Sequence, residues 1–132
     1  MQYAHARAHS VLRHAAEAFG AETVTAAALK QVDLSGLRDE DELGLIKVLA
    51  SWPRIVEQAA IAHEPHRIAF YLGEVAAAFH ALWNKGRDET TLRFIQEDAP
   101  QVTKARLALV CAMATVVASG LNVMGVVPRE SM

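Results

Sequence analysis

The stretch that decides the fold begins at Pro100 and reads PQVTKARLALVCAMATVVASG through Gly120. Proline suits the first turn of a helix and glycine the position just after its end, so the stretch predicts one long helix. The uncharged part runs from Leu107 to Val127, which at 21 residues is long enough to span a bilayer. Much of it is Ala, Gly, Ser, Thr and Asn, which insert poorly. We therefore interpret it as a helix buried in a bundle, and the protein as cytoplasmic with no membrane partner.

Helix starts and stops divide the rest of the chain in the same way. Asp39 and Glu42 have the spacing of a capping box. The expected helices cover residues 2–19 (ended by Gly20), part of 23–29, 39–50, 54–63 after a break at Pro53, and 65–85 (ended by Gly86). No window alternates in a strand-like way. The sequence predicts a single all-α domain over residues 1–132, an antiparallel bundle of five or six helices.

Composition supports this fold and excludes several function classes. The 132 residues include 25 alanines against 7 glycines and 4 prolines, a mixture that favours helix and a packed core. A single cysteine, Cys111, excludes an internal disulfide framework and a cysteine-based zinc site. The net charge of −2 argues against a sequence-independent nucleic-acid binder, and we expect no DNA partner.

The sequence offers no catalytic chemistry. His5 and His9 have i, i+4 spacing but lack an obvious third metal ligand. The serines lie in no Gly-x-Ser-x-Gly motif, and no glycine-rich loop follows a strand to hold a phosphate. We expect no catalytic residue, no metal site and no cofactor within this chain.

An aromatic and basic set remains. Its members are Phe79, His80, Trp83, Lys85, Arg87, Lys104 and Arg106. Spacing alone favours core aromatics with solvated charges around them. The alternative is a platform on which unpaired bases stack while cations hold the backbone.

Several motifs favour the platform for unpaired bases, because they resemble the C-terminal anticodon-binding domain of arginyl-tRNA synthetases. The opening Gln2-Tyr-Ala-His-Ala-Arg7 is similar to the segment that begins that domain. The stretch Phe79-His-Ala-Leu-Trp83 resembles its aromatic helix, and Ala105-Arg-Leu-Ala-Leu109 its last long helix. The ending, from Gly120 to Met132, resembles the family's Gly-Leu…Gly-Val/Ile stretch closing in Met, although Arg129-Glu-Ser131 departs from the usual Glu-Arg. The resemblance covers residues 2–132 and implies the all-α fold named DALR.

The resemblance implies the tRNA-recognition part of an arginine–tRNA ligase, a class I aminoacyl-tRNA synthetase that uses ATP and Mg. Both ATP-handling signatures of that class are absent. We therefore expect a C-terminal part of the enzyme, with Met1 added at its boundary and no activity alone. The implied partners are the anticodon loop of tRNA(Arg) and the missing catalytic domain. Two rivals stay open: a DALR domain of another synthetase, such as the glycyl enzyme's β subunit, and a helical protein-interaction module that binds no RNA.

The resemblance also implies site residues. Phe79 and Trp83 would stack on anticodon-loop bases, and Met132 would pack beside the anticodon. Tyr3, Arg7, Lys104 and Arg106 would contact bases or phosphates. This assignment requires the Phe79 ring to be exposed and to share one face with the C-terminal tail.

Overall fold

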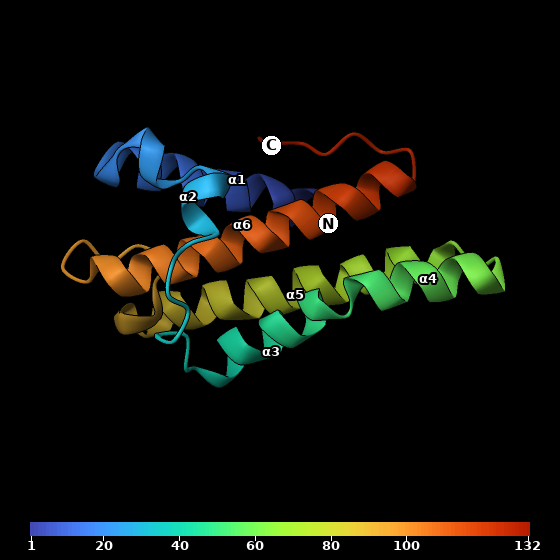
Figure 1. Cartoon of the computed structure of the whole chain (residues 1–132), viewed down its shortest axis with the longest axis horizontal. Coiled ribbons are helices and arrows are strands. Elements are labelled where there is room, and N and C mark those ends of the chain that lie inside the picture. The colour runs from blue at the N-terminus through green and yellow to red at the C-terminus, as the bar shows by residue number, and fades with distance from the viewer.

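The computed structural model describes all 132 residues and contains only helices and their connections (Figure 1). The α-helices are α1 (Gln2–Phe19), α2 (Ala26–Leu29), α3 (Glu40–Ala50), α4 (Trp52–Ala62), α5 (His66–Asp88) and α6 (Pro100–Val123), with 3-10 turns η1 (Ala21–Thr23) and η2 (Thr90–Leu92). Helices α1 and α5 run one way along the long axis, and α3, α4 and α6 run the other way (Figure 1). The predicted all-α antiparallel bundle is confirmed, with six helices.

Most predicted helix boundaries are confirmed by their cap geometry. The Asp39 side chain accepts a hydrogen bond from the Asp41 N–H at 3.0 Å, and Glu42 Oε1 accepts from the Asp39 N–H at 3.3 Å, which completes the capping box. Gly20 ends α1 with φ 97°, a left-handed value that glycine adopts without strain. Pro53 and Pro100 lie in the first turns of α4 and α6.

Two glycines do not end their helices, contrary to the prediction. Helix α5 continues past Gly86 to Asp88, and α6 continues past Gly120 to Val123. A Cβ at Gly86 would lie 2.9 Å from the Leu92 carbonyl oxygen, and one at Gly120 would lie 2.7 Å from the Leu72 side chain. Both glycines therefore permit close approach of a neighbouring segment, a role that helical spacing does not distinguish from that of a stop.

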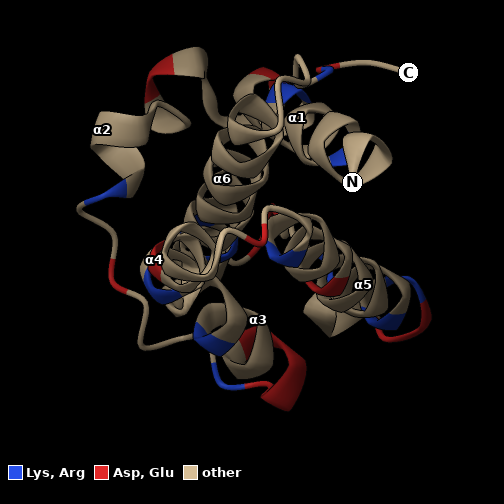
Figure 2. Ribbon diagram, turned by 90° about the vertical axis from the view of Figure 1, so that its right-hand side faces the viewer, with Lys and Arg blue, Asp and Glu red and all other residues tan.

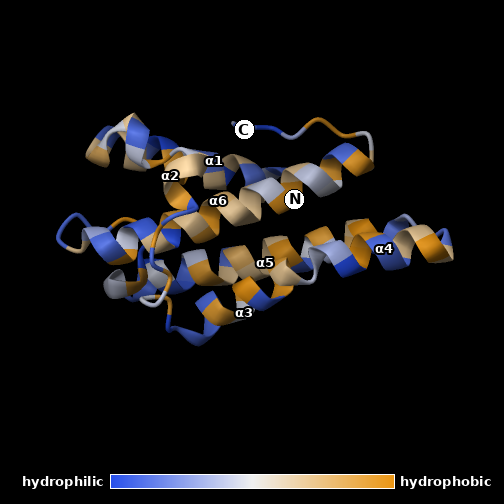
Figure 3. Cartoon of the chain, in the orientation of Figure 1, coloured by the Kyte–Doolittle hydropathy of each residue, from blue (hydrophilic) through white to orange (hydrophobic).

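Helix α6 is the central helix of the bundle. It packs against α1, α2, α3 and α5, and Figure 2 shows few charged residues along its length. Its length and composition would also suit a membrane span, but half of its apolar window is buried inside the bundle. Figure 3 shows that hydrophobic residues are frequent along α6 and α5, and many of them are buried. The interpretation of the apolar run as a core helix is confirmed.

Phe79 belongs to the core, which corrects its predicted exposure. Its side chain has 0% exposure and its ring stacks on that of Phe94, with centroids 5.7 Å apart and planes at 6°. The pairing was not evident from sequence because Phe94 lies in the connection after α5, 15 residues away. Phe79 therefore cannot stack on a base.

We predict that Phe79→Ala destabilises the fold by about 3–5 kcal/mol, the usual cost of a cavity left by a buried phenylalanine. Urea unfolding followed by circular dichroism measures this change. The matched control is Phe70→Ala, because Phe70 lies on the same helix and is 70% exposed. A urea unfolding curve for Phe79→Ala that overlays that of the control would contradict the buried position.

The glycines of α5 give a second stability prediction. Gly73→Ala, which meets nothing within 4 Å, should raise the free energy of unfolding by up to about 1 kcal/mol through helix propensity. Gly86→Ala should be less stable than Gly73→Ala by roughly 1–3 kcal/mol, because the new methyl group displaces backbone at Leu92 and Arg93. Equal stabilisation by both substitutions would mean that the connection does not pack on Gly86.

Candidate nucleic-acid interface

A group of rings and one cation, partly exposed at the surface, lies where α1 meets α5. We call Tyr3, Arg7, His80 and Trp83 the aromatic surface. The Arg7 guanidinium carbon lies 4.5 Å from the centre of the Tyr3 ring and 4.3 Å from that of Trp83. The His80 ring stacks on Tyr3, with centroids 5.5 Å apart and planes at 26°. Spacings of four residues on α1 and three on α5 bring these side chains to one site.

The charge of the aromatic surface comes from Arg7. No carboxylate lies within ion-pairing distance of Arg7, whose guanidinium instead donates to the Tyr3 hydroxyl. Burial lowers the pKa of His80, and the positive charges of Arg7 and the N-terminus lower it further. His80 is therefore neutral at pH 7. Single-stranded nucleic-acid sites combine aromatic side chains with cations, and both kinds of group are present here.

Buried rings support the exposed ones. Phe79 lies 5.6 Å from His80 and 6.5 Å from Trp83, and Phe94 lies 6.0 Å from Trp83, measured between ring centroids. Trp83 is partly buried and packs on the core, while Tyr3 is 51% exposed. Phe79 therefore holds the aromatic surface in place from below and is not itself part of it.

Arg106 is also buried, so its predicted RNA contact is wrong. It is 5% exposed, and its Nε donates to Glu42 Oε2 at 2.9 Å. Its Nη1 donates to the carbonyls of Thr91 and Arg93 at 2.8 and 2.9 Å. Arg106 thus joins α6 to α3 and to the connection after α5. Lys104 is partly exposed and forms no ion pair, so its contact stays a prediction.

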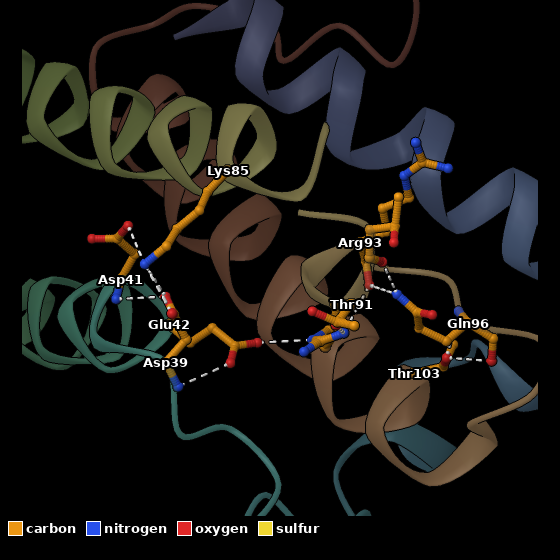
Figure 4. Close-up of polar contacts among 10 residues, drawn as sticks. Asp39, Asp41, Glu42, Lys85, Thr91, Arg93, Gln96 and Thr103 are labelled. Carbon is orange, nitrogen blue, oxygen red and sulfur yellow. Dashed lines mark hydrogen bonds and ion pairs between the residues drawn. The ribbon is translucent and has the colours of Figure 1, made fainter. Parts of the chain in front are cut away.

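Lys85 is engaged in a similar way. Its Nζ lies 2.8 Å from Asp39 Oδ1 and 3.3 Å from Asp41 Oδ2 (Figure 4). The hydrogen bond from Lys85 lowers the pKa of Asp39, and the same bond raises the pKa of Lys85. Lys85 therefore secures the start of α3 against α5.

The C-terminal tail lies on a different face of α1. Gln2 binds it at two points: its Nε2 donates to the Val127 carbonyl at 2.8 Å, and its Oε1 accepts from the Arg129 N–H at 2.8 Å. Arg13 Nη1 donates to the Glu130 carbonyl at 3.0 Å, and His5 Nδ1 lies 2.5 Å from the Arg129 carbonyl oxygen. The tail runs along the side of α1 that is remote from α5 (Figures 1 and 2).

Met132, at the end of this tail, is 76% exposed. The prediction that Phe79 and the tail share one face is wrong, because the tail binds the face of α1 opposite to the one that meets α5. A contact between Met132 and RNA stays a prediction.

Residues from the connection after α5 also border Trp83. Arg93 and Phe94 line a cavity next to this tryptophan, and neither was singled out from the sequence. The available signal was weak: Phe94 is the one aromatic residue between Glu89 and Ala99.

Comparisons with known proteins identify the family of the chain. The DALR anticodon binding domain family matches residues 1–132. The chain is 55% identical over 132 residues to the arginine–tRNA ligase of Parvibaculum lavamentivorans, 56% over 133 residues to that of Rhodospirillum rubrum and 54% over 132 residues to that of Xanthobacter autotrophicus. Each match covers 100% of this chain and 22% of the relative, so the chain spans about a fifth of the length of these curated relatives. The chain belongs to the DALR anticodon-binding domain family.

Proposed function

We propose that this chain is the part of an arginine–tRNA ligase that recognises the anticodon loop of tRNA(Arg). The observation that carries the proposal is the match of the whole chain to arginine–tRNA ligases at 50–56% identity. These names favour an arginine enzyme over a DALR domain of another synthetase. Similarity along the entire anticodon-binding domain also favours RNA recognition over a protein-interaction role.

The aromatic surface supports the proposal chemically. Anticodon bases are unpaired, and proteins recognise such bases by stacking them on aromatic side chains and Arg guanidinium planes. Tyr3 and Trp83 supply rings and Arg7 supplies a cation with no carboxylate partner. Arg7 already contacts both rings and the Tyr3 hydroxyl, and its remaining N–H groups can donate to a phosphate.

The chemistry of aminoacylation belongs elsewhere in this proposal. ATP and Mg bind the catalytic domain of the parent enzyme, in the roughly four-fifths of the relatives' length that this chain does not match. This chain contributes no catalytic residue and no cofactor ligand. Its partners are the tRNA and that catalytic domain, in the cytoplasm.

A filter-binding titration tests the proposal and separates its rivals. The three RNAs are an arginine-accepting tRNA transcript, the same transcript with an altered anticodon, and an unrelated tRNA. Preferential binding to the first transcript is expected. Preference for the unrelated tRNA would point to a different synthetase, and equal weak binding to all three would indicate a module without RNA recognition.

Substitutions on the aromatic surface should weaken this binding selectively. We expect Tyr3→Ala and Trp83→Ala each to cost about 1–3 kcal/mol of tRNA binding, the range for loss of one base–aromatic stack. Phe70→Ala is the control, because it removes an exposed ring from the far end of α5. Unchanged tRNA affinity in Tyr3→Ala, with the fold intact by circular dichroism, would show that the aromatic surface does not contact the tRNA.

Salt dependence gives an independent prediction. Binding of the cognate tRNA should weaken steeply as salt rises, because phosphate contacts release counterions. Replacement of a residue that contacts one phosphate of a single strand lowers the slope of log K against log salt by about 0.7. We expect that change for Arg7→Gln and none for Arg54→Gln, an exposed arginine on α4. Equal slopes for wild type and Arg7→Gln would exclude a phosphate contact by Arg7.

A further inference from the structure

Two residues near the start of α6 hold the connection that follows α5, and their hydrogen bonds to it all end on its backbone. The Thr103 hydroxyl accepts a hydrogen bond from the Gln96 N–H at 2.8 Å and donates one to the Gln96 carbonyl at 2.9 Å (Figure 4). Arg106 Nη1 donates to the carbonyls of Thr91 and Arg93 at 2.8 and 2.9 Å. Residues three apart share one face of a helix, so Thr103 and Arg106 act on the connection together. We call this pair the backbone clamp.

The backbone clamp is buried and is anchored from behind. Thr103 is 1% exposed and Arg106 is 5% exposed, and Arg106 Nε donates to Glu42 on α3. A buried ion pair is often no more stabilising than apolar side chains of the same volume. Stability alone therefore does not explain an arginine at this position. The guanidinium also sets the path of residues 89–99, whose one regular element is the short turn η2.

The clamped backbone carries the ring that supports Trp83. Phe94 lies between the clamped positions 93 and 96, and its side chain is buried. Its ring stacks on Phe79 and lies 6.0 Å from the Trp83 ring, measured between centroids. Trp83 in turn lies under the Arg7 guanidinium on the aromatic surface. A displacement of the clamped backbone would therefore move Phe94 and, through it, Trp83.

We propose that Thr103 and Arg106 are positioning residues for tRNA recognition, because they fix the backbone that places Phe94 and hence Trp83. The proposal rests on the proposed function and adds to it two buried residues that do not touch the RNA. A binding side chain keeps its geometry only when the residues behind it lock its position. Arg106 thus acts on recognition from inside the bundle.

Thr103 offers a matched pair of variants. Thr103→Val keeps the shape of the side chain and removes the hydroxyl, so both contacts to Gln96 are lost, while Thr103→Ser keeps the hydroxyl. The control is Tyr71→Phe, which removes another buried hydrogen bond, because the Tyr71 hydroxyl donates to the Val48 carbonyl at 2.7 Å. Tyr71 precedes Trp83 by 12 residues on α5, about 18 Å along the helix.

Binding is measured by titration of the full chain with the anticodon stem-loop RNA of tRNA(Arg) and with a version whose loop is scrambled. We expect Thr103→Val to bind the cognate stem-loop roughly tenfold more weakly, within the about 5- to 150-fold that loss of one base–aromatic stack represents. Thr103→Ser and Tyr71→Phe should bind like wild type. In a Trp83→Ala background, Thr103→Val should cause no additional loss, because both changes disable the same ring.

Fluorine NMR reads the position of Trp83 directly. The chain has two tryptophans, so labelling with 5-fluorotryptophan gives one signal for Trp52 and one for Trp83. Thr103→Val should shift or broaden the Trp83 signal and leave the Trp52 signal unchanged. Tyr71→Phe should do the reverse, because the Tyr71 ring stacks on Trp52 with centroids 5.5 Å apart. A loss of stability alone would not select Trp83.

Three results would overturn the proposal. If Thr103→Val binds as tightly as wild type while Trp83→Ala binds more weakly, the backbone clamp does not position the ring, and the proposed function stands. If Thr103→Val and Tyr71→Phe weaken binding equally, the effect is one of stability. If wild type does not prefer the cognate stem-loop over the scrambled one, the proposed function fails, and the role of the clamp fails with it.

Arg106→Lys replaces Thr103→Val if the latter does not fold. This change keeps a positive charge beside Glu42 and removes Nη1, the atom that makes both carbonyl contacts. The same expectations and the same three contrary results then apply to Arg106→Lys.

Discussion

The buried ion pair between Arg106 and Glu42 is the constraint on which the rest of the structure depends. Both side chains are almost completely buried, at 6% and 1% exposure, and their N–O distance is 2.9 Å. Burial of two charges costs several kcal/mol per ion and is tolerated where further hydrogen bonds complete the pair. Arg106 obtains them from the Thr91 and Arg93 carbonyls, and Glu42 from the Asp39 N–H. No buried side-chain nitrogen or oxygen in the structure lacks a partner.

This pair connects three parts of the chain that are distant in sequence. Glu42 is the closing residue of the α3 capping box, so the start of α3 and the second turn of α6 are fixed to each other. Lys85 connects α5 to the same point, because its Nζ donates a hydrogen bond to Asp39, the other residue of the capping box. The start of α3 therefore sets the position of the connection after α5, from which Arg93 and Phe94 line the cavity beside Trp83. A binding surface made of long side chains needs support of this kind to keep its geometry.

The sequence predicted the parts of this fold that depend on local signals. Helix caps, proline positions and the apolar period defined α1, α3, α4, α5 and α6 because each signal acts within a few residues. The errors arose where a residue responds to a distant segment. Gly86 and Gly120 were predicted to end helices, but the Leu92 backbone and the Leu72 side chain lie against them. Phe79 and Arg106 were predicted to contact RNA. Instead, Phe79 stacks on Phe94 in the core, and Arg106 is buried in an ion pair with Glu42. Tyr3 is exposed and Arg7 is partly exposed, so their predicted contacts with RNA stay predictions.

A chain with a net charge of −2 can present a cationic site because some of its cations are ion-paired and others are not. Arg106 is paired with Glu42 inside the bundle, and Lys85 is paired with Asp39 and Asp41 at its partly exposed edge, so these two cations are already matched by carboxylates. Around Trp83, by contrast, Arg7 and Arg93 have no carboxylate partner. Coulomb interactions of exposed charges are screened beyond about 8–10 Å at physiological salt, so an RNA strand at this site senses the local cations more than the total charge. Local pairing, and not composition, therefore decides which face of this domain attracts a phosphate backbone.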